Sequence, residues 1–295
     1  MRFWKKRQRR KLRAQPFPQT WVRVLESDVP LYRRLPADDR DELHGHIHVF
    51  LAEKHFEGCG GLAITDEIRV VIAAQACVLL LHRNTDYFPD LTSILVYPSS
   101  YVAPVTHVDA DIVTEYDLER TGETWEHGSL VLSWDDVAGA AAPMPSGDAQ
   151  DRRGNGRPHE RQVLHAAPST PTAGTRDDDE GELVPAYNIV LHEFAHQLDL
   201  ENGAIDGTPR LGTREAYDRW ARAFEAGFKE LEAQIDEGID PVIDDYALDD
   251  EVEFFAVATE SFFETPFALR DEFPDVYREL RSYFQQDPVE WFDPA

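Results

Sequence analysis

Residues 188–199 read Asn-Ile-Val-Leu-His-Glu-Phe-Ala-His-Gln-Leu-Asp and contain the pattern H-E-x-x-H. On a helix, His192 and His196 lie four residues apart and project from one face, so their ring nitrogens can share a zinc ion. Glu193 follows the first histidine, where its carboxylate can reach a water bound to the metal and take its proton. The pattern therefore predicts a helix that carries two zinc ligands and a general base.

The apolar residues around the two histidines strengthen this prediction. Six positions of the segment are apolar, which predicts a helix that is largely buried. Two histidines and a glutamate are costly inside such a helix unless a partner meets them. The alternative is a chance match in a buried helix, because the five-residue pattern alone is only moderately specific. The apolar positions are Ile189, Val190, Leu191, Phe194, Ala195 and Leu198.

The third protein ligand must come from elsewhere in the chain. The longer metzincin pattern H-E-x-x-H-x-x-G-x-x-H fails, because Asp199 and Asn202 occupy its glycine and final histidine positions. Asp199 could bind the metal, but its short side chain farther down the helix favours a role in orienting a ligand histidine. Spacing leaves three glutamates as alternatives, with Glu253 favoured over Glu260 and Glu215. The first two lie seven residues apart, on one face of a second apolar helix.

Hydrophobic spacing outward from this segment predicts a mainly helical chain with a few strands. His44, His46 and His48 lie in one predicted helix, where a spacing of two spreads them around the helix. We therefore expect surface or core histidines there and no metal site. Helices are predicted at 38–56, 70–81, 185–200, 214–237, 250–264 and 275–284, and strands at 94–97, 107–116 and 130–134.

The composition is that of an acidic globular protein. The 295 residues include 56 acidic and 29 basic ones, and the formal net charge is −27. A body this acidic repels phosphate backbones, which argues against direct binding of nucleic acid. Two cysteines make no disulfide framework, and neither a secretory signal nor a membrane span is recognised. We therefore expect a cytoplasmic protein without stable membrane association.

Composition also divides the chain into four parts. Residues 1–18 contain a basic run without acidic residues, and we predict a disordered, solvated arm there. Residues 138–183 are predicted to be a low-complexity, disordered insertion, because few bulky apolar residues there could offset the entropy of ordering. Residues 19–137 and 184–295 then form one domain, with the catalytic helices in the second part.

Several segments of the chain resemble segments of the Mlc titration factor A family of zinc peptidases, and they occur in the same order. That family is related in its catalytic helices to the metalloprotease domain of anthrax lethal factor. The resemblance covers most of the chain, but it does not include the basic arm, and the insertion is longer than the family pattern requires. It rests on residues 188–209 and 246–266, and on the shorter segments 94–98, 122–125, 130–134 and 283–288.

The resemblance implies roles for individual residues. The zinc glutamate of the family opens a motif E-x-F-A-V-x-x-E, so Glu253 is implied as the third ligand and Glu260 as a supporting residue. A functional tyrosine lies seven residues before that glutamate, at Tyr246 here, where a phenol could stabilise the oxyanion or assist the leaving amine. The implied fold is α+β, a mainly helical, gluzincin-like fold with a small sheet beside the active-site helix.

The motif and the resemblance together predict a zinc-dependent peptidase that binds one Zn²⁺ per chain. The resemblance implies aminopeptidase-like action on short peptides. It also suggests a partner, because family members bind the glucose-responsive repressor Mlc, and a Mlc-like transcriptional regulator would be the equivalent here. The alternative is a regulatory binding protein that sequesters such a repressor, with catalysis secondary or absent. Retention of Glu193 and Tyr246 favours catalysis, because a structural zinc site has no use for either.

Overall fold

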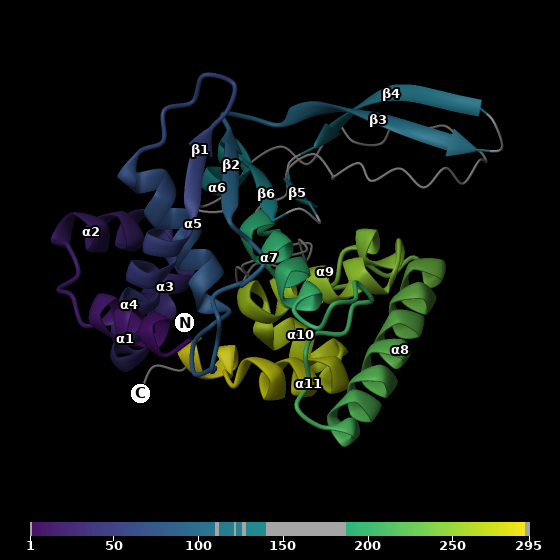
Figure 1. Ribbon diagram of the computed structural model, residues 1–295. Helices are drawn as coiled ribbons and strands as arrows, with labels where there is room; N and C mark the ends of the chain where they lie inside the picture. The colour runs from purple at the N-terminus through teal and green to yellow at the C-terminus, as the bar shows by residue number, and fades with distance from the viewer. Residues whose placement is uncertain (1, 110–111, 121, 126–127, 140–186, 293–295) are drawn as a thin grey trace.

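The chain folds into helices arranged around one small sheet, as Figure 1 shows for the computed structural model. Helices predominate, which confirms the predicted α+β class with a small sheet. None of the described helices combines the length and the apolar character needed to cross a bilayer. The structure describes residues 2–109, 112–120, 122–125, 128–139 and 187–292.

Four strands form the sheet in the order β1-β2-β6-β5. β1 (His55–Gly58), β2 (Ser93–Tyr97) and β6 (Ser129–Ser133) run parallel, and β5 (Gly122–Trp125) pairs antiparallel with β6. The connection from β1 to β2 contains α5 (Asp66–Val78), because parallel neighbours need a crossover. Alternate residues of the two central strands are fully buried, namely Ile94, Val96, Leu130 and Leu132.

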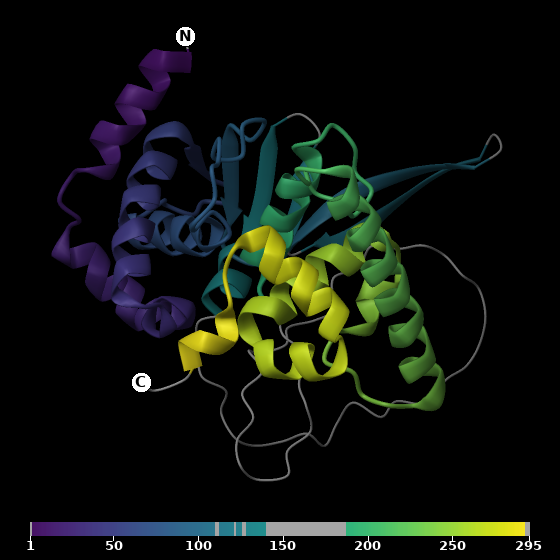
Figure 2. The same ribbon diagram turned by 90° about the horizontal axis from the view of Figure 1, so that it is seen from below.

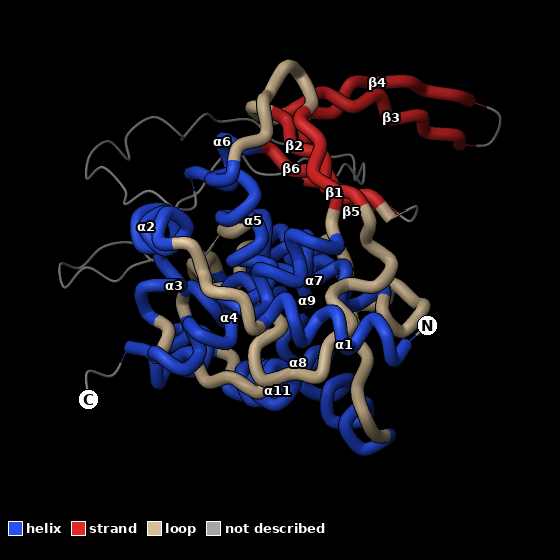
Figure 3. The backbone as a smooth tube through the Cα atoms, turned by 60° about the vertical axis from the view of Figure 1, so that its left-hand side comes forward, coloured by secondary structure: helices blue, strands red, loops and turns tan. Residues whose placement is uncertain are grey.

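A separate hairpin projects from this sheet, away from the helices (Figures 1 and 3). β3 (Tyr101–Asp109) and β4 (Ile112–Arg120) pair antiparallel. The single strand predicted at 107–116 is therefore wrong, since it falls on the end of one strand and the start of the next. Ala110 and Asp111 separate the two strands in the sequence, and the prediction overlooked that aspartate is typical of turns.

Two groups of helices lie on opposite sides of the sheet (Figure 2). The N-terminal group contains α1 (Arg2–Arg13), α2 (Gln19–Asp28), α3 (Pro30–Arg34) and α4 (Ala37–Glu53), together with α5. The C-terminal group contains α7 (Ile189–Leu200), α8 (Arg214–Glu237), the 3-10 helix η1 (Asp245–Leu248), α9 (Glu251–Glu264), α10 (Pro266–Glu272) and α11 (Pro274–Phe284). The described residues also include two short helices, α6 (Trp134–Gly139) and the 3-10 helix η2 (Pro288–Phe292).

Short polar side chains fix the starts of the C-terminal helices. Asn188, Thr213 and Asp250 each accept a hydrogen bond from a backbone N–H in the first turn of α7, α8 and α9. The predicted bounds of α8 are confirmed, and α9 begins one residue later than predicted. α7 begins four residues later than predicted, because Asn188 is its N-cap and lies outside the helix.

The basic N-terminus forms a helix, so the expectation of disorder is wrong for residues 2–13. Arg9 is buried, and its guanidinium donates to the two carboxylate oxygens of Glu53 at 2.7 and 2.8 Å. It also donates to Asp86 Oδ1 at 2.9 Å and lies over the ring of Tyr87. Glu53 and Asp86 are 44 and 77 residues away in the sequence, so the charge run alone gave no sign of its partners.

Two histidines of α4 contact side chains from other parts of the chain. His46 is fully buried, with Nδ1 2.9 Å from the Tyr87 hydroxyl and Nε2 3.2 Å from Glu42 Oε1. His44 Nε2 lies 3.0 Å from the Tyr32 hydroxyl. These rings are held by hydrogen bonds with protein groups.

The segment predicted as a disordered insertion, 138–183, lies outside the described residues apart from its first two, which end α6. α5 and α7 contact each other and come from the two sides of this segment. The division of the chain into an arm, an insertion and a single split domain otherwise stays a prediction.

Candidate metal centre

Two neighbouring helices bring three of the predicted site residues together. His192 and His196 lie on α7, and Glu253 lies in the first turn of α9, which packs against it (Figure 1). The Nε2 atoms of the two histidines are 3.1 Å apart. Glu253 Oε2 lies 3.1 Å from His192 Nε2, and Glu253 Oε1 lies 3.7 Å from His196 Nε2. The three side chains therefore converge on one point.

This set of atoms fits a tetrahedral metal ion. Zinc–ligand bonds of about 2.0–2.1 Å at tetrahedral angles place ligand atoms about 3.3 Å apart, and the three separations bracket that value. Glu253 Oε2 is buried without a hydrogen-bond partner, a cost that a cation would remove. Within the part of the chain that the structure describes, no other three His, Cys, Asp or Glu side chains are spaced to hold a metal.

Glu260 fixes the ring of His192, as the resemblance implied for a supporting residue. Its Oε1 lies 2.8 Å from His192 Nδ1, and its Oε2 accepts the backbone N–H of Asn188. When Nδ1–H donates a hydrogen bond to this carboxylate, Nε2 keeps its lone pair, which faces the point where the three side chains converge. Because Glu253 and Glu260 are two turns apart on α9, one helix supplies both groups.

A chain of polar groups continues from Glu260 to the N-terminal helices. The side-chain amide of Asn188 donates to Glu264 Oε1 at 3.0 Å, and Arg34 of α3 lies 3.6 Å from Glu264 Oε2. All three of Asn188, Glu260 and Glu264 are buried. Sequence reasoning missed Asn188, whose type signals the start of a helix but gives no sign of its contacts with α9.

Burial and charge act in opposite directions on Glu253. Burial favours the protonated carboxyl, but the adjacent His192 and His196 outweigh it and hold the pKa of Glu253 well below its usual range. The carboxylate is therefore ionised at neutral pH, which is the form that binds a metal ion.

Glu193 and Tyr246 lie beside the same centre. Glu193 follows His192 on α7 and is 5% exposed. Tyr246 lies in η1, and its ring centre is 6.0 Å from that of His192. Burial and the charges of Glu253 and Glu193 raise the pKa of Tyr246 well above its usual value. The phenol therefore keeps its proton at neutral pH and can donate a hydrogen bond.

Two alternatives for the third ligand lie elsewhere. Glu215 is exposed in the first turn of α8. Asp199 is fully buried, and its Oδ2 accepts the backbone N–H groups of Asp206 at 3.0 Å and Gly207 at 2.8 Å. Its Oδ1 and the Nδ1 of His196 both lack a hydrogen-bond partner. One oxygen of Asp199 thus holds the loop after α7, and the expectation that this residue orients a ligand histidine stays a prediction.

That loop lies directly against the start of α9. Gly207 has a φ of +71°, and a Cβ at this position would lie 2.1 Å from the backbone oxygen of Glu251. Only glycine fits such an approach in this conformation. The indole of Trp220 donates to Gly207 O at 3.2 Å and holds the loop from its other side. The loop thereby connects the two helices that carry the three converging residues.

Comparisons with known proteins extend over most of the chain. A sequence model of the family described as glucose-regulated metallo-peptidase M90 matches residues 2–155 and 169–285. This match begins in α1, so the basic N-terminus, which the resemblance left out, belongs to it.

Individual relatives show the same coverage. An uncharacterized protein of Synechocystis sp. is 34% identical over 288 residues, which cover 97% of this chain and 90% of the relative. Mlc titration factor A of Yersinia enterocolitica is 25% identical over 266 residues, or 89% of this chain and 84% of the relative. The corresponding values for Mlc titration factor A of Klebsiella pneumoniae are 25% over 274 residues, 92% and 87%. These similarities confirm the resemblance to the Mlc titration factor A family, and the chain belongs to the glucose-regulated metallo-peptidase family M90.

Proposed function

We propose that the protein is a zinc-dependent peptidase in which His192, His196 and Glu253 bind one Zn²⁺ per chain. The observation that carries this proposal is the convergence of their ligand atoms, with closest separations of 3.1 to 3.7 Å. Three protein ligands would leave a fourth position free for water or substrate, as in catalytic zinc sites. Membership of a metallopeptidase family supports hydrolysis of peptides at this centre.

The proposed mechanism gives each surrounding residue one task. When bound, zinc would lower the pKa of a water molecule towards neutrality and polarise the substrate carbonyl. Glu193 accepts the proton of the attacking water and delivers it to the leaving amine. Tyr246 donates a hydrogen bond to the carbonyl oxygen as negative charge develops there. Glu260 keeps the His192 ring in its ligating orientation.

We propose short peptides, cleaved in an aminopeptidase-like manner, as the substrates. The family resemblance suggests this preference, and charge supports it. A free α-amino group is cationic at neutral pH, and a protein with a net charge of −27 attracts it. Both cysteines are free, which favours the reducing conditions of the cytoplasm as the setting.

A second function is favoured by the names of the relatives. Several proteins about 25% identical to this chain are called Mlc titration factor A. The corresponding candidate is a regulatory protein that sequesters a Mlc-like transcriptional regulator, with hydrolysis secondary or absent. Glu193 and the protonated Tyr246 favour catalysis, because a structural metal site needs neither.

The variant Glu193→Gln separates these two functions. It keeps the three proposed ligands and removes the base, so we expect about one zinc per chain and a turnover reduced by about 10²–10⁴-fold. Zinc is counted by elemental analysis, and hydrolysis is measured on a panel of aminoacyl and short-peptide substrates. Glu215→Gln is the matched control, because it makes the same substitution at an exposed position away from the centre, and it should preserve both values.

Two results would contradict the proposed peptidase function. One zinc per chain in every variant, with no turnover even in the wild type, would favour the regulatory binding protein. A wild-type protein that contains no zinc and cannot take it up would contradict the metal centre itself.

A further inference from the structure

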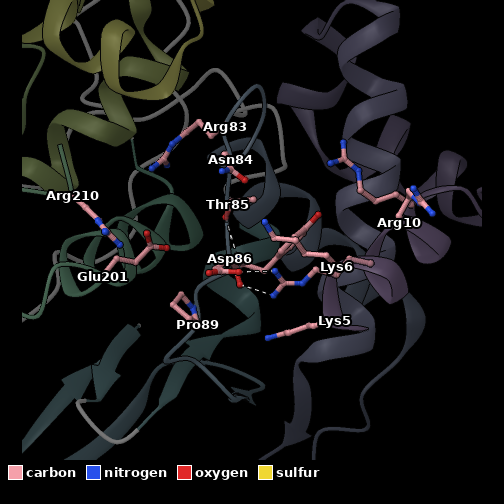
Figure 4. Close-up of a pocket in the computed structure, with 13 residues that line it drawn as sticks. Lys5, Lys6, Arg10, Arg83, Asn84, Thr85, Asp86, Pro89, Glu201 and Arg210 are labelled. Atoms are coloured by element: carbon pink, nitrogen blue, oxygen red, sulfur yellow. Dashed lines mark hydrogen bonds and ion pairs between the residues drawn. The ribbon is translucent and has the colours of Figure 1, made fainter. Parts of the chain in front are cut away.

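A hollow of about 890 Å³ lies between α1, the segment 83–89 and the loop that follows α7 (Figure 4). We call it the basic hollow, because seven of its lining side chains are basic and two are acidic. The whole chain has the opposite balance, with 56 acidic residues against 29 basic ones. Like charges gathered in one concave place repel one another, so this local reversal needs a physical reason.

Part of the positive charge is used within the protein. Arg9 is neutralised by Glu53 and by Asp86, which is one of the two acidic residues of the lining. Lys5 lies 3.4 Å from Glu53, and Arg13 lies 3.2 Å from a carboxylate of α4. These contacts explain why α1 packs against the rest of the protein. Other basic side chains of the lining take no part in them.

Lys6, Arg10 and Arg210 have no ion-pair or hydrogen-bond partner among the described residues. Lys6 and Arg10 are four residues apart on α1 and share one face. Arg210 lies on the opposite wall together with Glu201 (Figure 4). Burial raises the pKa of Glu201, the second acidic residue of the lining, and the charges of Arg83 and Arg210 oppose that effect. The basic hollow therefore carries a net positive charge that the protein itself does not neutralise.

The segment 82–88, part of which lines the basic hollow, has a strained backbone conformation. His82, Tyr87 and Phe88 have φ values of +60°, +62° and +52°, a left-handed conformation that costs energy for residues other than glycine. Tyr87 is held through its hydroxyl by His46, and Lys54 donates to the backbone oxygen of Phe88 at 2.6 Å. Arg9 joins α1, which carries Lys6 and Arg10, to this segment through Asp86. Two of the unpaired cations are thus carried by a helix that is fastened to the segment, which lowers the entropy lost when a ligand binds.

We propose that the basic hollow binds a compact, multiply charged anion, a ligand with two or more phosphate groups. Its volume lies in the range of small-molecule sites, and cations on facing walls suit a ligand that enters between them. Clustered, unpaired Lys and Arg side chains are the groups that recognise phosphates. The phosphates could belong to a free metabolite or to the headgroup of a phosphorylated lipid.

The test is calorimetric titration of the full-length, metal-loaded protein with pyrophosphate. We expect binding in the wild type and a loss of about tenfold or more in affinity in Lys6→Gln/Arg10→Gln, with a smaller loss in Arg210→Gln. Arg7→Gln/Lys11→Gln is the matched control. It removes the same charge from the same helix at residues outside the lining, and its affinity should stay within about twofold of the wild type. Thermal unfolding and zinc content, measured before and after titration, verify that each variant is folded and keeps its metal.

Vesicles that contain a phosphorylated phosphoinositide distinguish the two sources of phosphate. Sedimentation with these vesicles that pyrophosphate competes away, and that Lys6→Gln/Arg10→Gln lacks, would assign a lipid headgroup. Pyrophosphate binding without sedimentation would assign a free anion. The proposal is overturned if the wild type does not bind pyrophosphate at about 1 mM. It is also overturned if both double variants lose affinity equally, or if neither does.

Discussion

Two helices of this protein carry closely spaced histidines, and their surroundings differ. On α4 the spacing is two residues, and both ring nitrogens of His46 have separate partners, Tyr87 and Glu42. On α7 the spacing is four residues, and the Nε2 atoms of His192 and His196 face each other at 3.1 Å. The comparison teaches that burial of histidines does not mark a metal site. A metal site is indicated when the ring nitrogens of two histidines and the oxygens of a carboxylate converge on one point.

The two regions also differ in how the cost of burying polar groups is offset. Around His46, hydrogen bonds between protein groups offset that cost. Around His192, one ring nitrogen is satisfied by Glu260, while Glu253 Oε2 keeps no hydrogen-bond partner. The first arrangement is complete without a ligand, and the second is completed by a cation. Substitutions of the site residues on α7 and α9 should therefore reduce the metal content, whereas substitutions on α4 should reduce stability and leave the metal content unchanged.

The largest difference is expected for loss of a proposed ligand. His196→Ala should reduce zinc from about one per chain to almost none, and hydrolysis with it, because two remaining ligands hold zinc weakly. His44→Ala should keep its zinc, since His44 pairs with Tyr32 away from the centre. Elemental analysis and the peptide assay measure both. Equal zinc loss in the two variants would break the distinction between α4 and α7.

A smaller loss of zinc binding is expected when the residue that supports a ligand is substituted. Glu260→Gln should weaken zinc binding by about 10–100-fold, because the His192 ring loses the carboxylate that orients it. Glu251→Gln makes the same substitution at an exposed position of the same helix and should stay close to the wild type. Competition with a chromogenic chelator gives the affinities. Unchanged zinc binding in Glu260→Gln would refute the supporting role.

Substitution of the buried His46 should reduce stability and leave the metal in place. His46→Ala leaves the Tyr87 hydroxyl without its partner inside the protein, so we expect a loss of about 1–3 kcal/mol in the free energy of unfolding. Tyr87→Phe, which removes only the hydroxyl, should cost less. Urea unfolding measures these losses, and zinc content should stay at that of the wild type. Loss of zinc in His46→Ala without a loss of stability would contradict a purely structural role for His46.

The smallest effect concerns pH. The hydrogen bond with His46, against the opposing effect of burial, lowers the pKa of Glu42 from 4.5 to about 2. A carboxyl with a lower pKa in the folded state stabilises the protein above pH 4.5, and this contribution disappears as the pH falls towards 2. After a discount for partial solvent exposure, we expect about 1 kcal/mol. The stability difference between the wild type and Glu42→Gln should shrink over this range, and a constant difference would argue against the assignment.

The sequence predicted what depends on local spacing. The shared faces of His192 and His196, four residues apart, and of Glu253 and Glu260, seven residues apart, each follow from the geometry of one helix. Hydrophobic spacing likewise placed the starts of α8 and α9 to within one residue. These features need no knowledge of distant parts of the chain, and the family resemblance then selected Glu253 from the remaining alternatives.

Features that depend on distant partners were missed. The docking of α1 relies on Arg9 meeting Glu53 and Asp86, which are far away in the sequence. The hydrogen bonds that Asp199 Oδ2 accepts from the backbone of Asp206 and Gly207 likewise could not be inferred from its position on the helix. A polar residue can satisfy its hydrogen bonds in several directions, and only the packed structure determines which one is used.

The contact at Gly207 has a consequence for protein engineering. A residue with a side chain at this position would collide with the backbone of Glu251, two residues before the proposed ligand Glu253. The loop after α7 therefore acts as a fixed spacer between two helices, and its glycine sets how closely they approach. Anyone who grafts the centre onto another scaffold must transfer this spacer as well as the ligands. Libraries that diversify the loop should hold position 207 constant.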